Sequence, residues 1–386
     1  MRNDGASICF VTSEYPPVPG GVSTSARRIV AYLAGAGYRV HVFAPGPRDL
    51  AGVTIGDEGG VTVTRVPPPA DAFELGRLAY REVAKADRQR PFDLFHGFYM
   101  AMGFACLSTA KRGSRPLLAS IRGSDATEWI EDPAKVPFVK AVLEQAGWVT
   151  SVSTDLLDRA SAVCRLDGRS SVILNAIAPS APPSWQPNAG NRGVVGTVGE
   201  FRESKGTLQL IDAYSRLPSG MRQRLCLIGY YASDDYRTRC EAAIRANDLE
   251  SGVSVTGLLG RNEVAASLPG LRVYVQPSLT DGFPNALLEA AAAGVPLVAY
   301  RTGGMRDVLV DGENALVVSP GDVAGLARAI ERVLIDDDLA IRLGRAARAL
   351  AERCHPAQEQ AAWLALYERL LARESAQSIA SSPSRQ

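Results

Sequence analysis

Short apolar runs rich in β-branched residues alternate with helix-length amphipathic stretches along nearly the whole chain. In the first half these runs are ICFVTS, RVHVFA, VTVTRV, FDLFHG, LLASI, WVTSV and SVIL, and in the second half they are GVVGTVG, LCLIG, VSVTG, VYVQPS, PLVAY and ALVV. Strands that are apolar throughout and separated by helices are typical of parallel sheets covered on both faces. The pattern therefore predicts two α/β halves.

The chain of 386 residues is longer than the usual single domain, and a proline-rich stretch divides it. Proline and glycine interrupt both strands and helices, so this stretch suits an interdomain linker. We predict an N-terminal domain over 1–178, a linker over 179–192 and a C-terminal domain over 193–356. A helix over 357–373 is expected to pack back on the N-terminal domain, and the polar segment 374–386 is expected to be disordered.

Composition excludes several classes of function. The formal net charge is +1, so the chain lacks the basic excess of a nucleic-acid-binding protein. The six cysteines show no CxxC spacing, and no cluster has the spacing of a zinc site. No run approaches the roughly 18 apolar residues of a membrane span. These features predict a cytoplasmic protein with free thiols, and contact with the inner face of a membrane stays open.

The stretch TDGFPNALLEAAAAGVP, residues 280–296, follows a predicted strand and carries the acids Asp281 and Glu289. Pro284 and Gly294 mark the start and the end of a helix over about 284–293. Ligands of open parallel sheets bind beyond the carboxyl ends of strands, and a helix N-terminus attracts anions. The stretch predicts a site for a ligand with an anionic part and hydroxyl groups, whereas an isolated pair of this kind is more often two solvated acids.

Two further turns between a strand and a helix have unusual chemistry. In GEFRESKG, residues 199–206, Arg202 and Lys205 are close enough in sequence to converge on one diphosphate. Lys205 is also the only lysine after Lys140, although the alternative of a solvated basic turn stays open. Near the N-terminus, Gly20 and Gly21 precede a helix with Ser23 or Thr24 as its expected cap, and their backbone can approach a phosphate or a sugar.

These motifs carry a resemblance to a known family. YPPVPGGVSTSARRIVAYLAGAGYRVHVFA, SVILNAI, GEFRESKG and, above all, PSLTDGFPNALLEAAAAGVPLVAYRTGGMRDVLVDGENALVV resemble the retaining glycosyltransferases of family 4. The resemblance covers almost the whole chain and is strongest over 193–335. It implies the GT-B fold, in which two Rossmann-like doubly wound domains face a cleft.

The resemblance also implies roles for individual residues. Glu289 would hold the ribose hydroxyls of a nucleoside-diphosphate sugar, and Arg202 with Lys205 would neutralise the diphosphate without a metal or another cofactor. Asp281 and the backbone around Gly282 would hold the transferred sugar. The expected donor contacts are completed by Gly20, Gly21, Phe283, Asn285 and Leu287.

Three positions depart from the pattern of the family. The acid pair is usually Glu and Glu, whereas this chain has the shorter Asp281, and Glu200 stands where an arginine often follows the glycine. Where many members have a histidine, this chain has Arg122, which is expected to hold a sugar hydroxyl or an anionic acceptor with Asp125 orienting it. The alternative is a structural ion pair of Arg122 and Asp125. His96, at the end of a strand, is expected to contact the acceptor or to be an ordinary satisfied histidine.

The acceptor cannot be identified from the sequence, and saccharides, lipid-linked saccharides and small molecules are all compatible with it. A basic stripe on the helix of residues 73–90 would suit an anionic lipid or a phosphorylated acceptor, although such a stripe is more often a solvated helix face. The predicted function is retaining sugar transfer from a nucleotide sugar to a hydroxyl group. The alternatives are a sugar-nucleotide epimerase and a non-catalytic subunit that binds a nucleotide sugar.

Overall fold

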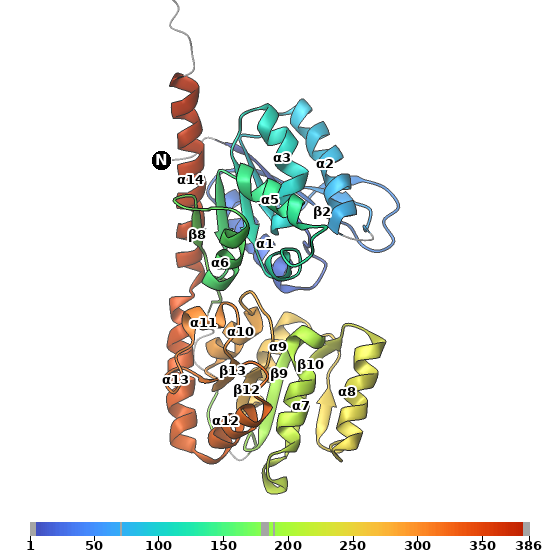
Figure 1. Cartoon of the computed structure of the whole chain (residues 1–386), viewed down its shortest axis with the longest axis vertical. Helices are drawn as coiled ribbons and strands as arrows, with labels where there is room; N and C mark the ends of the chain where they lie inside the picture. The colour runs from blue at the N-terminus through green and yellow to red at the C-terminus, as the bar shows by residue number, and fades with distance from the viewer. Residues whose placement is uncertain (1–4, 70–71, 179–184, 188–189, 381–386) are drawn as a thin grey trace, which may run out of the picture. The chain divides into compact units, whose positions relative to one another are not determined.

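A computed structural model describes residues 5–69, 72–178, 185–187 and 190–380. The chain forms two compact units, each a sheet flanked by helices (Figure 1). Unit 1 comprises the chain up to Leu174 together with the segment from Glu359 onward, and unit 2 comprises Asn175–Gln358. The prediction of two Rossmann-like parallel-sheet halves is confirmed.

Unit 1 contains a sheet with the strand order β3-β4-β2-β1-β5-β6-β7-β8. All neighbouring strands are parallel except β3 and β4. The strands are β1 (Ser7–Thr12), β2 (Arg39–Pro45), β3 (Thr54–Asp57), β4 (Thr62–Val66), β5 (Leu94–Phe98), β6 (Leu117–Ile121), β7 (Trp148–Ser151) and β8 (Ser170–Val172). The helices are α1 (Gly21–Gly35), α2 (Ala72–Gln89), α3 (Gly103–Arg112), α4 (Ser124–Thr127), α5 (Val136–Gln145) and α6 (Thr154–Val163), with a 3₁₀ turn η1 (Met100–Met102).

Unit 2 contains a fully parallel sheet with the strand order β11-β10-β9-β12-β13-β14. The strands are β9 (Val194–Phe201), β10 (Arg224–Tyr231), β11 (Val253–Val255), β12 (Val273–Gln276), β13 (Leu297–Tyr300) and β14 (Leu316–Val318). The helices are α7 (Thr207–Ser215), α8 (Asp234–Ala246), α9 (Arg261–Ser267), α10 (Asn285–Ala293), α11 (Met305–Val308), α12 (Val323–Ile335) and α13 (Asp337–Arg353), and the 3₁₀ turns are η2 (Glu203–Lys205), η3 (Ser219–Met221) and η4 (Leu268–Gly270).

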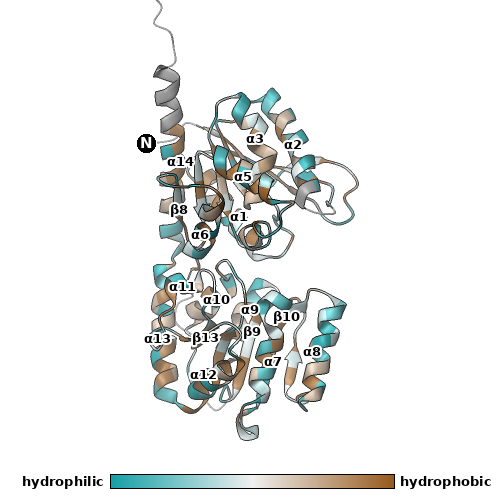
Figure 2. Cartoon of the chain, viewed as in Figure 1, coloured by the Kyte–Doolittle hydropathy of each residue, from teal (hydrophilic) through white to brown (hydrophobic). Residues whose placement is uncertain are grey.

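Hydrophobic burial explains these layers. The residues of β1, β5, β6, β12 and β13 are buried throughout, as expected for strands covered on both faces. The outer helices instead alternate hydrophilic and hydrophobic faces, which is clear for α8 and α13 in Figure 2. The order of strands places the carboxyl ends of β9 and β12 side by side, so the turns that follow these two strands can share one site.

The last helix, α14 (Pro356–Ala380), supplies part of the core of unit 1. Its residues Trp363, Leu366, Tyr367 and Leu370 pack in one cluster with residues of β1 and β2. Glu359 of α14 accepts hydrogen bonds from Arg28 Nε at 2.5 Å and from Tyr32 Oη at 3.1 Å. These contacts join the end of the chain to α1.

Two expectations for the chain's connecting segments need comment. The expected disorder over 374–386 stays a prediction, and the helix α14 is assigned as far as Ala380. Residues 381–386 of the expected tail, and 179–184 and 188–189 of the expected linker, lie outside the described residues. Trp185, also in the expected linker, donates from Nε1 to the Leu271 carbonyl of unit 2 at 2.6 Å.

Candidate donor site of unit 2

The turn after β9 and the turn after β12 are in direct contact. The backbone N–H groups of Leu279 and Thr280 donate to the Ser204 carbonyl at 2.9 and 3.3 Å. Gly206 has a φ of +68°, and a Cβ atom there would lie 1.8 Å from the Pro277 carbonyl oxygen. Only glycine allows this approach, because an L side chain would collide with the backbone of the other turn. The contact places η2, which ends at Lys205, against the loop that holds Asp281.

Lys205 and Asp281 form an ion pair at this junction. Lys205 Nζ lies 2.6 Å from Asp281 Oδ2, and the two side chains are 27% and 10% exposed. Ser278 Oγ also donates to Asp281 Oδ2, at 3.1 Å. Asp281 therefore reaches the only lysine of unit 2. The pair places a positive charge next to a carboxylate that can accept hydrogen bonds from hydroxyl groups.

Glu289 lies on α10, the helix that follows the turn of Asp281. It lies half-buried in the second turn of α10, where burial raises the pKa of its carboxyl and the charge of Arg261 opposes that rise. The buried phenol of Tyr274 connects Glu289 with Asp281 electrostatically: burial raises the pKa of Tyr274, and both carboxylates raise it further. The two acids at the ends of the stretch therefore act on one buried group of β12.

The start of α10 offers backbone groups. The helix begins at Asn285 after Pro284 and ends before Gly294, which has a φ of +80°. This confirms the predicted helix to within one residue. Pro284 has no side-chain acceptor, so its own side chain does not cap the first-turn N–H groups, which carry the positive end of the helix dipole. The side chains of Phe283 and Leu287 are 4% and 0% exposed, so these two predicted donor contacts can act only through the backbone.

Arg202 is placed differently from Lys205. Its side chain is 47% exposed, and its Nε lies 4.0 Å from Glu200 Oε2. The structure thus pairs Lys205 with Asp281, while Arg202 lies near Glu200. Lys205 is the stronger candidate for the phosphate contact.

The first group of predicted site residues in unit 1 is the glycine turn before α1. Gly20 is the N-cap of α1, which begins at Gly21, so the expectation of Ser23 or Thr24 as the cap was wrong. Ser23 is instead 2% exposed within the first turn. Gly20 has a φ of +150°, a backbone conformation that side chains other than glycine rarely adopt.

His96 is a core residue. It is fully buried, with Nδ1 2.5 Å from Tyr367 Oη and Nε2 2.6 Å from Ser120 Oγ. Because both ring nitrogens have partners inside unit 1, the expectation that His96 contacts an acceptor was wrong and the satisfied histidine is what the fold contains. Burial, and then the charge of Arg122, lower the pKa of this imidazole well below its usual range.

Arg122 and Asp125 lie in the turn after β6. Asp125 is fully buried, and its carboxylate accepts from the backbone N–H groups of Met100, Gly123 and Arg122 at 2.7, 2.7 and 3.0 Å. The Arg122 guanidinium stacks over the Phe98 ring at 4.5 Å, and burial lowers the pKa of Arg122 to about 10. Asp125 thus fixes the backbone of the turn that carries Arg122.

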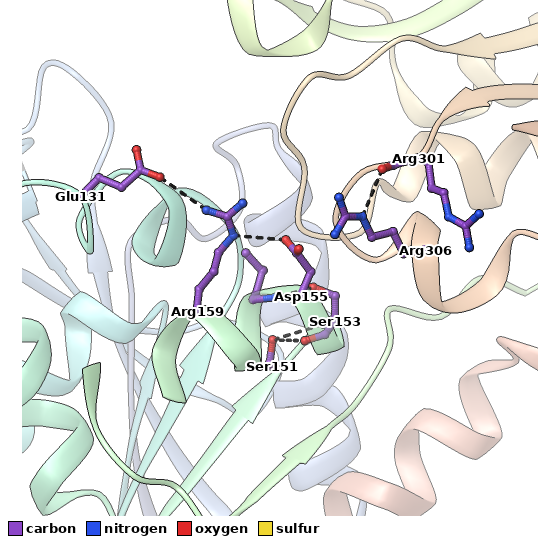
Figure 3. A network of polar contacts seen from close by, with 8 residues as sticks. Glu131, Ser151, Ser153, Asp155, Arg159, Arg301 and Arg306 are labelled. Atoms are coloured by element: carbon purple, nitrogen blue, oxygen red, sulfur yellow. Dashed lines mark hydrogen bonds and ion pairs between the residues drawn. The ribbon is translucent and has the colours of Figure 1, made fainter. Parts of the chain in front are cut away.

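Figure 3 shows one further strand-to-helix turn in each unit. In unit 1, Ser153 caps α6, its N–H donates to Ser151 Oγ at 3.2 Å, and Asp155 lies 3.3 Å from Arg159. In unit 2, Arg306 Nε donates to the Arg301 carbonyl at 3.1 Å in the turn after β13. These turns carry local polar networks that hold the backbone, and none of the predicted site residues belongs to them.

Reasoning from the sequence missed Arg261 and the polar residues of β12. Arg261 opens α9 and acts on Glu289, and the signal for it was a Gly-Arg pair at a turn between a strand and a helix. Gln276 and Ser278 are 3% and 0% exposed next to Asp281. Gln276 ends β12 and Ser278 follows it two residues later, and polar residues at the end of an otherwise apolar run were the available signal.

We expect Gly206→Ala to destabilise unit 2 by about 1–3 kcal/mol more than Gly312→Ala, because of the collision with the Pro277 carbonyl. Both glycines have left-handed backbones, with φ of +68° and +75°. A Cβ on Gly312 meets nothing within 4 Å, so this control isolates the collision from the conformational cost. Urea unfolding of both variants measures the difference, and equal losses would show that the two turns do not press on each other.

Two surveys of the described residues bear on membranes and metals. None of the described helices has the length and hydropathy needed to cross a bilayer. Within the same part of the chain, no group of three or more His, Cys, Asp or Glu side chains is arranged to hold a metal ion. The expectation that no metal is required stays a prediction.

Two family models match successive parts of the chain. The family model described as Glycosyltransferase Family 4 matches residues 19–181, and the model described as Glycosyl transferases group 1 matches residues 184–350. The 2-deoxystreptamine glucosyltransferase of Streptomyces kanamyceticus is 32% identical over 182 residues, which are 47% of this chain and 46% of that protein. The match thus spans just under half of that relative's length.

Solved structures share the whole architecture. Sucrose-phosphate synthase from Thermosynechococcus elongatus aligns with a TM-score of 0.82 at 21% identity over 95% of this chain and 100% of that chain. HepE from Anabaena, solved in complex with UDP-glucose, aligns with a TM-score of 0.76 at 17% identity over 94% and 99%. At these identities the structures establish the fold. With both family models matched in succession, the chain belongs to the GT-B glycosyltransferases and is of the family 4 type.

Proposed function

We propose that this glycosyltransferase moves a sugar, with retention of configuration, from a nucleoside-diphosphate sugar to a hydroxyl acceptor. The observation that carries the proposal is the 2.6 Å pair of Lys205 and Asp281 at the carboxyl ends of neighbouring strands, with the half-buried Glu289 on the helix that follows the Asp281 turn. HepE, which shares the fold, was solved with UDP-glucose, and the Streptomyces kanamyceticus relative is named a glucosyltransferase. The HepE complex supports a nucleotide sugar as the donor, and the relative's name supports transfer of a sugar.

The chemistry assigns a role to each group. In transfer, the bond between the sugar's anomeric carbon and the diphosphate oxygen breaks, and a bond to the acceptor oxygen forms on the same face. The acceptor's proton passes to the departing diphosphate. The anomeric centre becomes oxocarbenium-like while negative charge grows on the leaving group. Lys205 and the N–H groups at the start of α10 are the preorganised donors that would stabilise that charge.

The remaining polar groups would orient the donor. Glu289 would accept hydrogen bonds from the ribose hydroxyls, and Asp281 would accept from a sugar hydroxyl. Arg202 is a second candidate for the diphosphate, and Gly20 and Gly21 remain predicted donor contacts. A saccharide, a lipid-linked saccharide or a small molecule would serve as the acceptor, and the charge of Lys205 is proposed to make a metal unnecessary.

A panel of nucleotide sugars tests the proposal. UDP-glucose, UDP-N-acetylglucosamine, GDP-mannose and ADP-glucose are each added to the full chain, and melting temperature and release of nucleoside diphosphate are recorded. We expect one donor to raise the melting temperature by mass action and to release its nucleoside diphosphate in the presence of an acceptor mixture. Proton NMR of the product's anomeric signal then decides retention against inversion.

Each other outcome contradicts a part of the proposal. Binding without release under any acceptor would favour the non-catalytic subunit, and an inverted anomer would refute retention. Failure of all four donors to bind would refute the assignment of a donor site for these nucleotide sugars. The match to glycosyltransferase families leaves the epimerase alternative without support.

A further inference from the structure

A row of buried polar side chains runs along β12 into the candidate site. Tyr274, Gln276 and Ser278 alternate along the chain, so their side chains project from the same face. Tyr274 Oη lies 2.5 Å from Gln276 Oε1, and Gln276 Nε2 lies 2.7 Å from Ser278 Oγ. Ser278 Oγ then meets Asp281 Oδ2, which meets Lys205 Nζ. The three side chains of the row are 0%, 3% and 0% exposed.

The carboxylate at the end of the row fixes the direction of every hydrogen bond. A carboxylate only accepts, so the Ser278 hydroxyl must donate to Asp281. The Ser278 oxygen therefore accepts from the Gln276 amide nitrogen, and the Gln276 oxygen accepts from the Tyr274 hydroxyl. The opposite orientation of the amide would place two acceptors against each other at Ser278. The row has one polarity, with every donor aimed toward Asp281.

This row restricts the positions of the Asp281 carboxylate and the Lys205 ammonium. Asp281 Oδ2 receives Ser278 and Lys205, so a sugar hydroxyl would be accepted by Oδ1. Thr302 Oγ1 donates to the Ser278 carbonyl at 3.0 Å, which ties the backbone of the same loop to the turn after β13. Because a buried donor or acceptor without a partner costs about 1–3 kcal/mol, the row holds its members more firmly than a solvated pair would be held.

We infer that Gln276 and Ser278 are positioning residues for the transfer reaction, which orient the Asp281 carboxylate and, through it, the Lys205 ammonium. The inference rests on the proposed function for its catalytic consequence, but the orientation itself is a property of unit 2 alone. Neither residue touches the reacting atoms. Their role is to keep a flexible lysine in one place before the donor arrives, which lowers the cost of organising the site.

A matched pair of variants separates polarity from packing. Gln276→Glu keeps the shape of the side chain, but its carboxylate accepts from Ser278 and turns that hydroxyl away from Asp281. Gln276→Met fills a similar volume and leaves the Ser278 hydroxyl able to donate to Asp281. If the row orients Asp281, Gln276→Glu should change the Lys205 signal and kcat strongly, and Gln276→Met should change them little. A role in packing alone predicts similar effects.

The first measurement needs no substrate. The chain has five lysines, and all except Lys205 lie in unit 1, so [ε-¹³C]lysine labelling gives five signals with four internal controls. Lys205→Arg assigns the signal of interest. At pH 8 we expect the Lys205 signal to move toward the position of solvated lysines in Gln276→Glu and in Ser278→Ala, but not in Gln276→Met. An unmoved signal in Gln276→Glu would overturn the inference.

The second measurement is transfer with the panel donor that the wild type uses. We expect kcat of Gln276→Glu to fall at least about 10-fold at pH 8, and that of Gln276→Met to fall less than about 3-fold. Burial raises the pKa of the carboxyl introduced by Gln276→Glu. The neutral carboxyl can again donate to Ser278, so the kcat of this variant relative to wild type should recover as pH falls toward 6. A pH-independent ratio, or equal losses in both variants, would contradict the inference. If no donor is used, the proposed function fails while the NMR measurement still decides the positioning role.

Discussion

Replacing Lys205 by alanine is expected to lower kcat/KM for sugar transfer by about 10²-fold or more. Lys205 is the cation that the structure places at the junction of the two turns, 2.6 Å from Asp281. Negative charge on the departing diphosphate grows in the transition state, so a fixed ammonium beside it lowers the barrier more than it strengthens binding of the donor. Initial rates with the donor found in the panel measure the change.

Lys135→Ala is the matched control. Lys135 Nζ lies 2.9 Å from Asp132 Oδ2, and its side chain is 33% exposed, close to the 27% of Lys205. Its loss removes an ion pair of unit 1 whose lysine is similarly exposed, so activity should stay at the wild-type level. The melting temperature of Lys205→Ala, measured without donor, separates lost chemistry from lost folding. A folded and fully active Lys205→Ala enzyme would refute the phosphate assignment.

Glu289→Gln is expected to weaken binding of the nucleoside-diphosphate part of the donor by about 10- to 100-fold, since hydrogen bonds to a charged acceptor contribute about 1.5–3 kcal/mol. The same change should leave the free protein as stable as the wild type, or make it more stable. Burial raises the pKa of Glu289, so keeping this carboxylate ionised costs folding free energy. The amide removes that cost and also the acceptor for the ribose.

The sign of the pH dependence follows from the raised pKa of Glu289. An acid whose pKa is higher in the folded state binds more protons when folded, so its contribution to stability is present below the unfolded pKa and is lost as pH rises through the folded one. The stability gained by Glu289→Gln should therefore grow as pH is raised from about 4.5. Urea unfolding of the free protein at several pH values measures this trend.

Glu331→Gln, on α12, serves as the control for Glu289→Gln, because Glu331 is also a half-buried glutamate within a helix of unit 2. Calorimetric titration with UDP, GDP and ADP compares binding in the two variants with that of the wild type. Unchanged affinity in Glu289→Gln would contradict the ribose assignment. A loss of affinity in Glu331→Gln would show that the assay does not report on the site.

The sequence could predict most of the strands and the helix that carries Glu289. Buried parallel strands are apolar along their whole length, so periodicity alone separates them from amphipathic helices. Proline and glycine likewise marked the ends of α10 to within one residue. The short strand β3 was missed, since all four of its residues are exposed and no apolar pattern marks it.

Which side chains meet was decided by tertiary structure. Lys205 and Asp281 are far apart in the chain, and they meet because β9 and β12 are neighbours and Gly206 lets the two turns touch. For His96 the sequence left open an acceptor contact or an ordinary satisfied histidine, and in the fold the residue is buried with Nδ1 2.5 Å from Tyr367 Oη of α14. Local patterns record propensity and burial, which depend on near neighbours in sequence. The pairing of charges and hydrogen bonds depends on distances that only the packed sheet and its turns create.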